Sequence, residues 1–138
     1  MKSLHLKLPV ALISLLALFT LSSCSHNLRE EFDMSVSKYN NMLSSNELGT
    51  ASLFAADGVR ANYLARAAAL KDTRIIDYHI INSAYAEEKQ RATVEVEMSY
   101  YNLYTYKVKS LRDMQQWIYS EEKGIKGWRI NSLLPEFK

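Results

Sequence analysis

The spacing of apolar residues predicts a long helix at the start of the folded region. Apolar side chains recur at steps of four and three and form a single stripe, made of Leu28, Phe32, Val36, Tyr39 and Leu43. Asn27, followed three residues later by Glu30, matches a capping box, so the helix is expected to begin there. The polar run Ser44-Ser45-Asn46 is expected to end it.

Two shorter helical stretches are expected next. The first holds Leu48, Leu53 and Phe54 and breaks at Asp57-Gly58. The second covers residues 59–70, where a run of alanines favours a helix and permits close approach to a neighbouring surface. Arg60 and Arg66 of this helix are expected in solvent.

From Thr73 onward the apolar period changes to two, which predicts strands. In residues 74–84 the alternation places Ile76, Tyr78 and Ile80 on the inner face, and therefore Asp77 and His79 on the outer face. The polar residues 86–90 are expected to form a hairpin loop. Residues 91–101 alternate most clearly, with these side chains inward: Ala92, Val94, Val96, Met98 and Tyr100.

The remaining chain predicts two further strands and two hairpins. A turn is expected within the tyrosine-rich residues 101–109, a strand over 115–120, a hairpin over 121–127 and a last strand over 128–133. The predicted fold is α+β, with N-terminal helices packed on one face of a curved, four-stranded, mostly antiparallel sheet. In this register no carboxylate or histidine lies on the inner face of the sheet.

The first residues carry an export signal rather than a membrane span. Lys2 and Lys7 form a short positive segment, and residues 8–21 are almost wholly apolar and uncharged. This run is shorter than the ~20 apolar residues that a transmembrane helix needs, and it fits the apolar region of a signal peptide.

The signal ends in Leu21-Ser22-Ser23-Cys24, which resembles the lipobox of bacterial lipoproteins. The resemblance implies that residues 1–23 are cleaved off and that the thiol of Cys24 carries a diacylglyceryl group. Its acyl chains, such as palmitate, would anchor residues 24–138 to a membrane. Ser25 in place of aspartate favours the outer membrane, facing the periplasm.

Composition limits the kinds of function that remain. Without residues 1–23 the chain is long enough for a single domain, and it holds 15 basic and 15 acidic side chains. This balance argues against a nucleic-acid partner. Cys24 is the only cysteine, and His79 is the only histidine of the predicted fold. We therefore expect no metal site, no cofactor, and no cysteine or serine nucleophile with a histidine partner.

The order of elements resembles the nuclear transport factor two-like superfamily, which also includes ketosteroid isomerases. The likeness lies in Arg74-Ile75-Ile76-Asp77-Tyr78, Gln116-Trp117-Ile118-Tyr119 and Gly127-Trp128-Arg129-Ile130. It implies a cone-shaped domain that binds a small molecule, performs acid–base chemistry inside the cone, or dimerises through the outer face of its sheet. The alternative is a cystatin-like single helix on a sheet, which leaves two helical stretches unexplained.

Two sets of residues are candidates for function. Asp77 and His79 are expected on the surface or in an interface, and they become catalytic candidates only if the register is reversed. Tyr101, Tyr104 and Tyr106 form either a recognition patch or part of the core. The first hypothesis is a non-catalytic envelope lipoprotein that binds a protein partner, a second copy or a small apolar ligand. The alternatives are an isomerase-like or dehydratase-like enzyme and an accessory subunit of an envelope machine.

Overall fold

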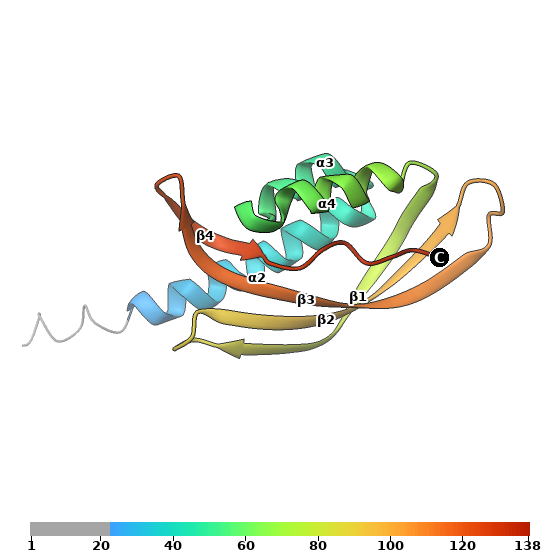
Figure 1. The fold of residues 1–138 in the computed structure, drawn as a ribbon. Coiled ribbons are helices and arrows are strands. Elements are labelled where there is room, and N and C mark those ends of the chain that lie inside the picture. Colours follow the sequence, from blue (N-terminus) through green and yellow to red (C-terminus); the bar gives the residue numbers. More distant parts are fainter. Residues whose placement is uncertain (1–22) are drawn as a thin grey trace, which may run out of the picture.

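The computed structural model describes the backbone of residues 23–138 and the side chains from Leu28 onward (Figure 1). The predicted signal peptide and the side chain of Cys24 lie outside the described residues. The helices are α2 (Ser23–Ser44), α3 (Leu48–Ala51), the 3-10 turn η1 (Ser52–Phe54) and α4 (Asp57–Ala69). The strands are β1 (Thr73–Ala86), β2 (Arg91–Asn102), β3 (Val108–Glu122) and β4 (Ile125–Ile130). Within these bounds no helix is long and apolar enough to cross a membrane.

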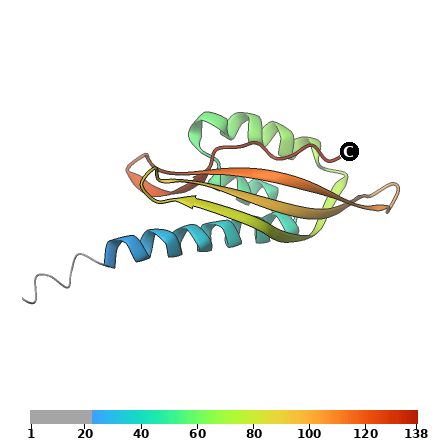
Figure 2. The same cartoon turned by 90° about the horizontal axis from the view of Figure 1, so that it is seen from below.

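The strands form one antiparallel sheet in the order β1-β2-β3-β4. Figures 1 and 2 show a curved sheet with the helices on its concave side. The core lies between the two layers and includes Phe32, Tyr39, Val96, Trp117 and Leu134. The predicted α+β fold class is therefore confirmed.

α2 buries the predicted stripe, since Phe32, Val36, Tyr39 and Leu43 are all buried. It begins at Ser23, four residues before the expected cap at Asn27. Asn46 follows its C-terminal end in the left-handed conformation, with φ of 59°. The side-chain amide of Asn46 bonds both the N–H and the carbonyl of Ile75, so the end of α2 is fixed to β1.

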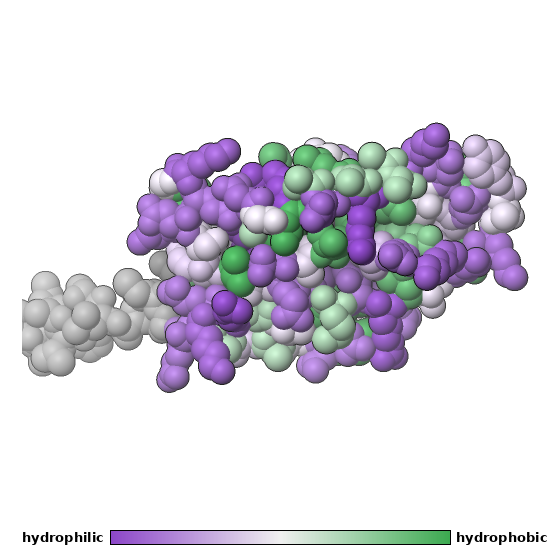
Figure 3. Space-filling view, in the orientation of Figure 1, coloured by the Kyte–Doolittle hydropathy of each residue, from purple (hydrophilic) through white to green (hydrophobic). Residues whose placement is uncertain are grey.

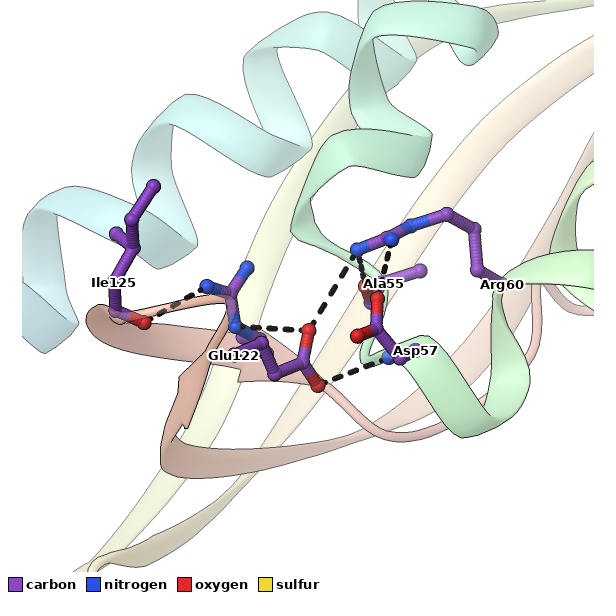
Figure 4. Close-up of polar contacts among 6 residues, drawn as sticks. Ala55, Asp57, Arg60, Glu122 and Ile125 are labelled. Atoms are coloured by element: carbon purple, nitrogen blue, oxygen red, sulfur yellow. Dashed lines mark hydrogen bonds and ion pairs between the residues drawn. The ribbon is translucent and has the colours of Figure 1, made fainter.

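α4 begins at Asp57, where the sequence predicted a break, because its first turn is capped from the sheet. Ala56 has no side-chain acceptor, and Glu122 of β3 instead accepts the Asp57 N–H at 2.9 Å. Figure 4 shows Glu122 between this N–H and the guanidinium of Arg60. Arg129 also pairs with Glu122, at 3.2 Å.

The arginines of α4 are bound rather than free in solvent, which corrects the prediction. Arg60 bonds Asp57 and the carbonyl of Ala55 (Figure 4). Arg66 donates to the carbonyl of Leu134 in the C-terminal segment. Together with the approach of Arg60 to Glu122, these contacts link α4 to β3 and to the chain that follows β4.

β1 departs from simple alternation at two bulges. The register with β2 shifts between Ile75 and Asp77 and again between Ile80 and Asn82. Ile76 is therefore unpaired and about half exposed (46%) instead of facing inward, which corrects the predicted inner face. Tyr78 still faces the helices, since its hydroxyl donates to Asn41 of α2.

β3 is longer than predicted, and this changes which side chains face inward. It begins at Val108 rather than near residue 115, and Asp113 pairs with the inward-facing Val96. Asp113 is only 7% exposed, so a carboxylate does lie on the inner face, contrary to the prediction. The turn Lys123-Gly124 has positive φ at both residues, as a two-residue type I′ hairpin requires, and β4 starts earlier than expected.

Candidate functional site

A cluster of polar side chains lies inside the domain, between α2, α4 and β3. Gln115 and Asn40 are fully buried and exchange two amide hydrogen bonds, of 2.7 and 3.2 Å. The hydroxyl of Tyr63 donates to that of Tyr39 at 2.9 Å. Asp113 completes the cluster, and the sequence prediction missed it.

Asp113 is the least satisfied member of this cluster. Its Oδ2 atom is buried and has no hydrogen-bond partner among the described residues. Burial raises the pKa of Asp113 from its ordinary value of 3.8 to about 6, and a hydrogen bond from Gln115 opposes the rise. Burial also raises the pKa of Tyr39 and Tyr63, and the negative charge of Asp113 adds to both shifts.

A carboxylic acid near two tyrosine hydroxyls can serve as a general acid or base in catalysis. Here the groups are sealed, because Tyr39 and Tyr63 have no exposed surface and their hydroxyls bond each other. Asp113 itself keeps only 7% of its surface exposed, which leaves a substrate little access to it. Among residues 23–138 no group of three or more His, Cys, Asp or Glu side chains could hold a metal ion.

Asp77 and His79 lie on the outer face of the edge strand β1. Both side chains are exposed, and the His79 Nε2 atom is 3.5 Å from a carboxylate oxygen of Asp77. The other oxygen of Asp77 accepts the N–H of Tyr78. Asn82 does the same for Ser83, five residues further on.

These two contacts belong to a repeated pattern. The same order of residues occurs twice in β1: an isoleucine paired with β2, an isoleucine in the bulge, and a polar side chain that accepts the next backbone N–H. The two copies are Ile75-Ile76-Asp77-Tyr78 and Ile80-Ile81-Asn82-Ser83. β1 is one of the two edge strands of the sheet, and unpaired N–H groups on an edge strand invite pairing with another strand. The bulges and the side-chain acceptors make this edge less able to pair with another strand. Asp77 therefore has a structural role at the position where the sequence suggested an interface.

Tyr101, Tyr104 and Tyr106 gather at the hairpin that joins β2 to β3. Tyr104 and Tyr106 are 79% and 71% exposed, and the ring of Tyr106 stacks on that of Tyr101 with centroids 5.8 Å apart. We call these three residues the tyrosine hairpin. Figures 1 and 2 place this hairpin at the end of the domain opposite the start of α2.

The middle of the outer sheet face is charged rather than apolar. Arg112 of β3 pairs with Glu95 at 3.1 Å and with Glu97 at 3.8 Å, both on β2. Exposed ion pairs of this kind contribute little to stability. They lie at the centre of the face where the superfamily resemblance implied a dimer contact, beside the half-exposed Met114.

Comparisons with known proteins show similarity at the level of fold. No model of a protein family matches the chain, and no curated protein is similar to it in sequence. Among solved structures, a SEC-C motif containing protein from Rhodopseudomonas palustris is similar, with a TM-score of 0.51 and 12% sequence identity. The match covers 67% of this chain and 68% of that chain. At this identity the likeness concerns the fold alone.

Proposed function

We propose that the protein is a bacterial envelope lipoprotein that is anchored through Cys24 and presents the tyrosine hairpin to a protein partner. The observation that carries the proposal is the position of Leu21-Ser22-Ser23-Cys24 directly at the start of α2. No linker separates the proposed anchor from the folded domain. We also propose that the domain is a member of the nuclear transport factor two-like superfamily, which its sequence resembles.

The geometry supports a presenting role for the domain. α2 has 22 residues, which corresponds to ~33 Å at 1.5 Å per residue. A lipid at its N-terminus would hold the hairpin loops of Glu87–Gln90 and Lys123-Gly124 nearer the bilayer, because these lie at the same end of the domain (Figure 1). The tyrosine hairpin would then face away from the membrane. Tethering would also raise its local concentration around membrane-bound partners.

The chemistry of the tyrosine hairpin suits a protein interface. Tyrosine rings are enriched at interfaces because they offer a large apolar area and a hydroxyl that can hydrogen-bond. Tyr104 and Tyr106 are mostly exposed, although burying them against the protein's own core would be favourable. Lys107 and the exposed Val108 extend this surface along the start of β3.

One observation favours the second candidate, an isomerase-like or dehydratase-like enzyme. Asp113 lies inside the domain with a raised pKa and two nearby tyrosines, which is the kind of acid that such chemistry needs. The sealed hydroxyls of Tyr39 and Tyr63 weigh against it, so we retain the binding function as the leading proposal.

Site-specific photo-crosslinking in the native bacterium tests the partner proposal. A photoreactive benzoylphenylalanine replaces Tyr104, and the matched control carries it at Glu88, an exposed position at the opposite end of the domain. We expect a discrete crosslinked product with another protein from position 104 and none from position 88. Adding Tyr106→Ala should weaken the product, because it removes the ring that stacks on Tyr101.

Two outcomes of this experiment would contradict the proposal. Identical crosslinks from both positions would mean that the tyrosine hairpin has no special role. A product of twice the chain's own mass would show that the hairpin contacts a second copy rather than a different protein.

A further inference from the structure

Residues 131–138, which we call the strap, have no regular secondary structure and run back between α4 and β3 (Figure 1). Leu134 fixes the middle of the strap, since it is fully buried in the core. Arg66 of α4 donates to its carbonyl. Beyond Leu134 the strap is less buried, since Pro135 and Phe137 are half-buried and Glu136 and Lys138 are exposed.

The end of the strap places one ring and one oxygen against the sheet. The ring of Phe137 packs edge-on against Tyr100, with centroids 4.9 Å apart and planes at 82°. The carbonyl oxygen of Lys138 accepts from the Tyr100 hydroxyl and from the ammonium of Lys109, the latter at 3.1 Å. This part of β2 and β3 therefore binds an aromatic group joined to an oxygen acceptor.

Cavities lie on both sides of the same two strap residues. One, of about 350 Å³, is bounded by Tyr100, Lys107 and Lys109. The other, of about 390 Å³, is bounded by Arg66 and Leu70. Phe137 and Lys138 line both of them. In Figure 3 apolar residues gather on the face that carries α4 and the strap.

The charges around the strap favour an anion once its end is displaced. Glu136 lies 3.3 Å from the Lys138 ammonium and 3.9 Å from Arg66. Moving residues 136–138 away removes this carboxylate from the site and leaves Lys109 without the main-chain oxygen of Lys138, while Arg66 keeps its bond to the carbonyl of Leu134. A bound carboxylate would then accept a charge-assisted hydrogen bond from Lys109 in place of the main-chain oxygen of Lys138.

We infer that the end of the strap occupies a binding site for a small aromatic or apolar carboxylate, which enters by displacing Phe137 and Lys138. The carboxylate accepts from Lys109 and the Tyr100 hydroxyl, and the apolar part takes the place of the Phe137 ring. The strap competes with the ligand for the same site. The apparent affinity of the ligand is therefore proportional to the fraction of molecules in which the end of the strap is released. This site goes beyond the partner-binding proposal and does not depend on the lipid anchor.

The test uses 3-phenylpropionate, which joins a phenyl ring to a carboxylate, and the protein as it is isolated from the native bacterium. Saturation-transfer NMR titrations measure its Kd against that of the uncharged 3-phenylpropanol. We expect a Kd on the order of 1 mM for the carboxylate, as befits so small a ligand, and much weaker binding of the alcohol. Lys109→Gln should weaken carboxylate binding roughly ten-fold through the loss of a charge-assisted hydrogen bond. The control Lys126→Gln, an exposed lysine on β4, should not change it.

Phe137→Ala separates competition from ordinary packing. Loss of the ring contact loosens the strap, so the carboxylate should bind several-fold more tightly than to the wild type. Weaker binding to Phe137→Ala, equal binding of acid and alcohol, or no binding to either protein would each overturn the inference. Should Phe137→Ala fail to fold, the comparison of Lys109→Gln with Lys126→Gln still decides it. None of these outcomes bears on the crosslinking result at Tyr104.

Discussion

Replacing Asp113 with asparagine should stabilise the protein at neutral pH, which is unusual for a change at a buried position. Asp113 is 7% exposed, and its Oδ2 atom has no hydrogen-bond partner within residues 23–138. The charged carboxylate is therefore taken out of water with only partial compensation from Gln115. Asparagine has nearly the same shape and removes the charge.

The magnitude follows from the raised pKa of Asp113, about 6 in the folded protein against an ordinary 3.8. A group with a raised folded pKa keeps its proton in the folded state while the unfolded chain has lost it. Below pH 3.8 Asp113 is protonated in both the folded and the unfolded state, so it does not lower the free energy of unfolding. Between these two pKa values the free energy of unfolding falls as the pH rises. Above pH 6 it stays lower by the full amount. A shift of this size corresponds to about 3 kcal/mol at neutral pH, as an upper limit.

Denaturant unfolding of the wild type and Asp113→Asn at pH 4 and pH 7.5 measures this effect. We expect the asparagine variant to be more stable by about 1–3 kcal/mol at pH 7.5, with the difference nearly gone at pH 4. The neighbouring hydrogen bond from Gln115 is retained, because the asparagine carbonyl still accepts. A variant that is less stable than the wild type at pH 7.5, or a difference that is the same at both pH values, would refute the reasoning.

Three further predictions concern contacts elsewhere in the fold. Glu122→Ala should lower the free energy of unfolding by about 2 kcal/mol, because it removes the acceptor of the α4 N-terminus and the carboxylate that Arg60 and Arg129 share (Figure 4). The double change Asp77→Ala and Asn82→Ala should increase self-association in light scattering, because it frees two N–H groups on the β1 edge. Tyr39→Phe should cost about 1–2 kcal/mol, because the buried Tyr63 hydroxyl loses its acceptor.

Each of these has a matched control. Glu121→Ala changes an exposed neighbour of Glu122 and should leave stability almost unchanged. Exchanging the residues, as Asp77→Asn with Asn82→Asp, keeps both acceptor oxygens and should not promote association. Removing both hydroxyls, with Tyr39→Phe and Tyr63→Phe together, should cost less than Tyr39→Phe alone. An effect of equal size in the control would contradict the corresponding argument.

β2 could be predicted from the sequence because its two faces meet different surroundings. Ala92, Val94, Val96 and Met98 are buried, while the residues between them are more exposed. The sequence shows the same contrast as an alternation of apolar and polar residues. The stripe of α2 was predictable for the same reason. In both cases one face packs on the core over many residues.

The inward position of Asp113 could not be predicted in this way. Its side of the sheet depends on where β3 begins, and the inner positions before Trp117 include the polar residues Asp113 and Gln115. They therefore carry no apolar signal. Ile76 was assigned to the wrong face because a bulge sets two residues of β1 opposite one of β2. That mismatch is a property of the pairing between strands and not of β1 alone.

The central claim, a lipid anchor on Cys24 at the start of α2, is tested most directly by intact mass spectrometry of the protein extracted from native membranes. The account predicts a chain that begins at Cys24 and carries the added mass of a diacylglyceryl group, with or without a further acyl chain. The variant Cys24→Ser should retain residues 1–23 and lack that mass. A wild-type chain with an unmodified Cys24, or one that retains its first 23 residues, would contradict the claim.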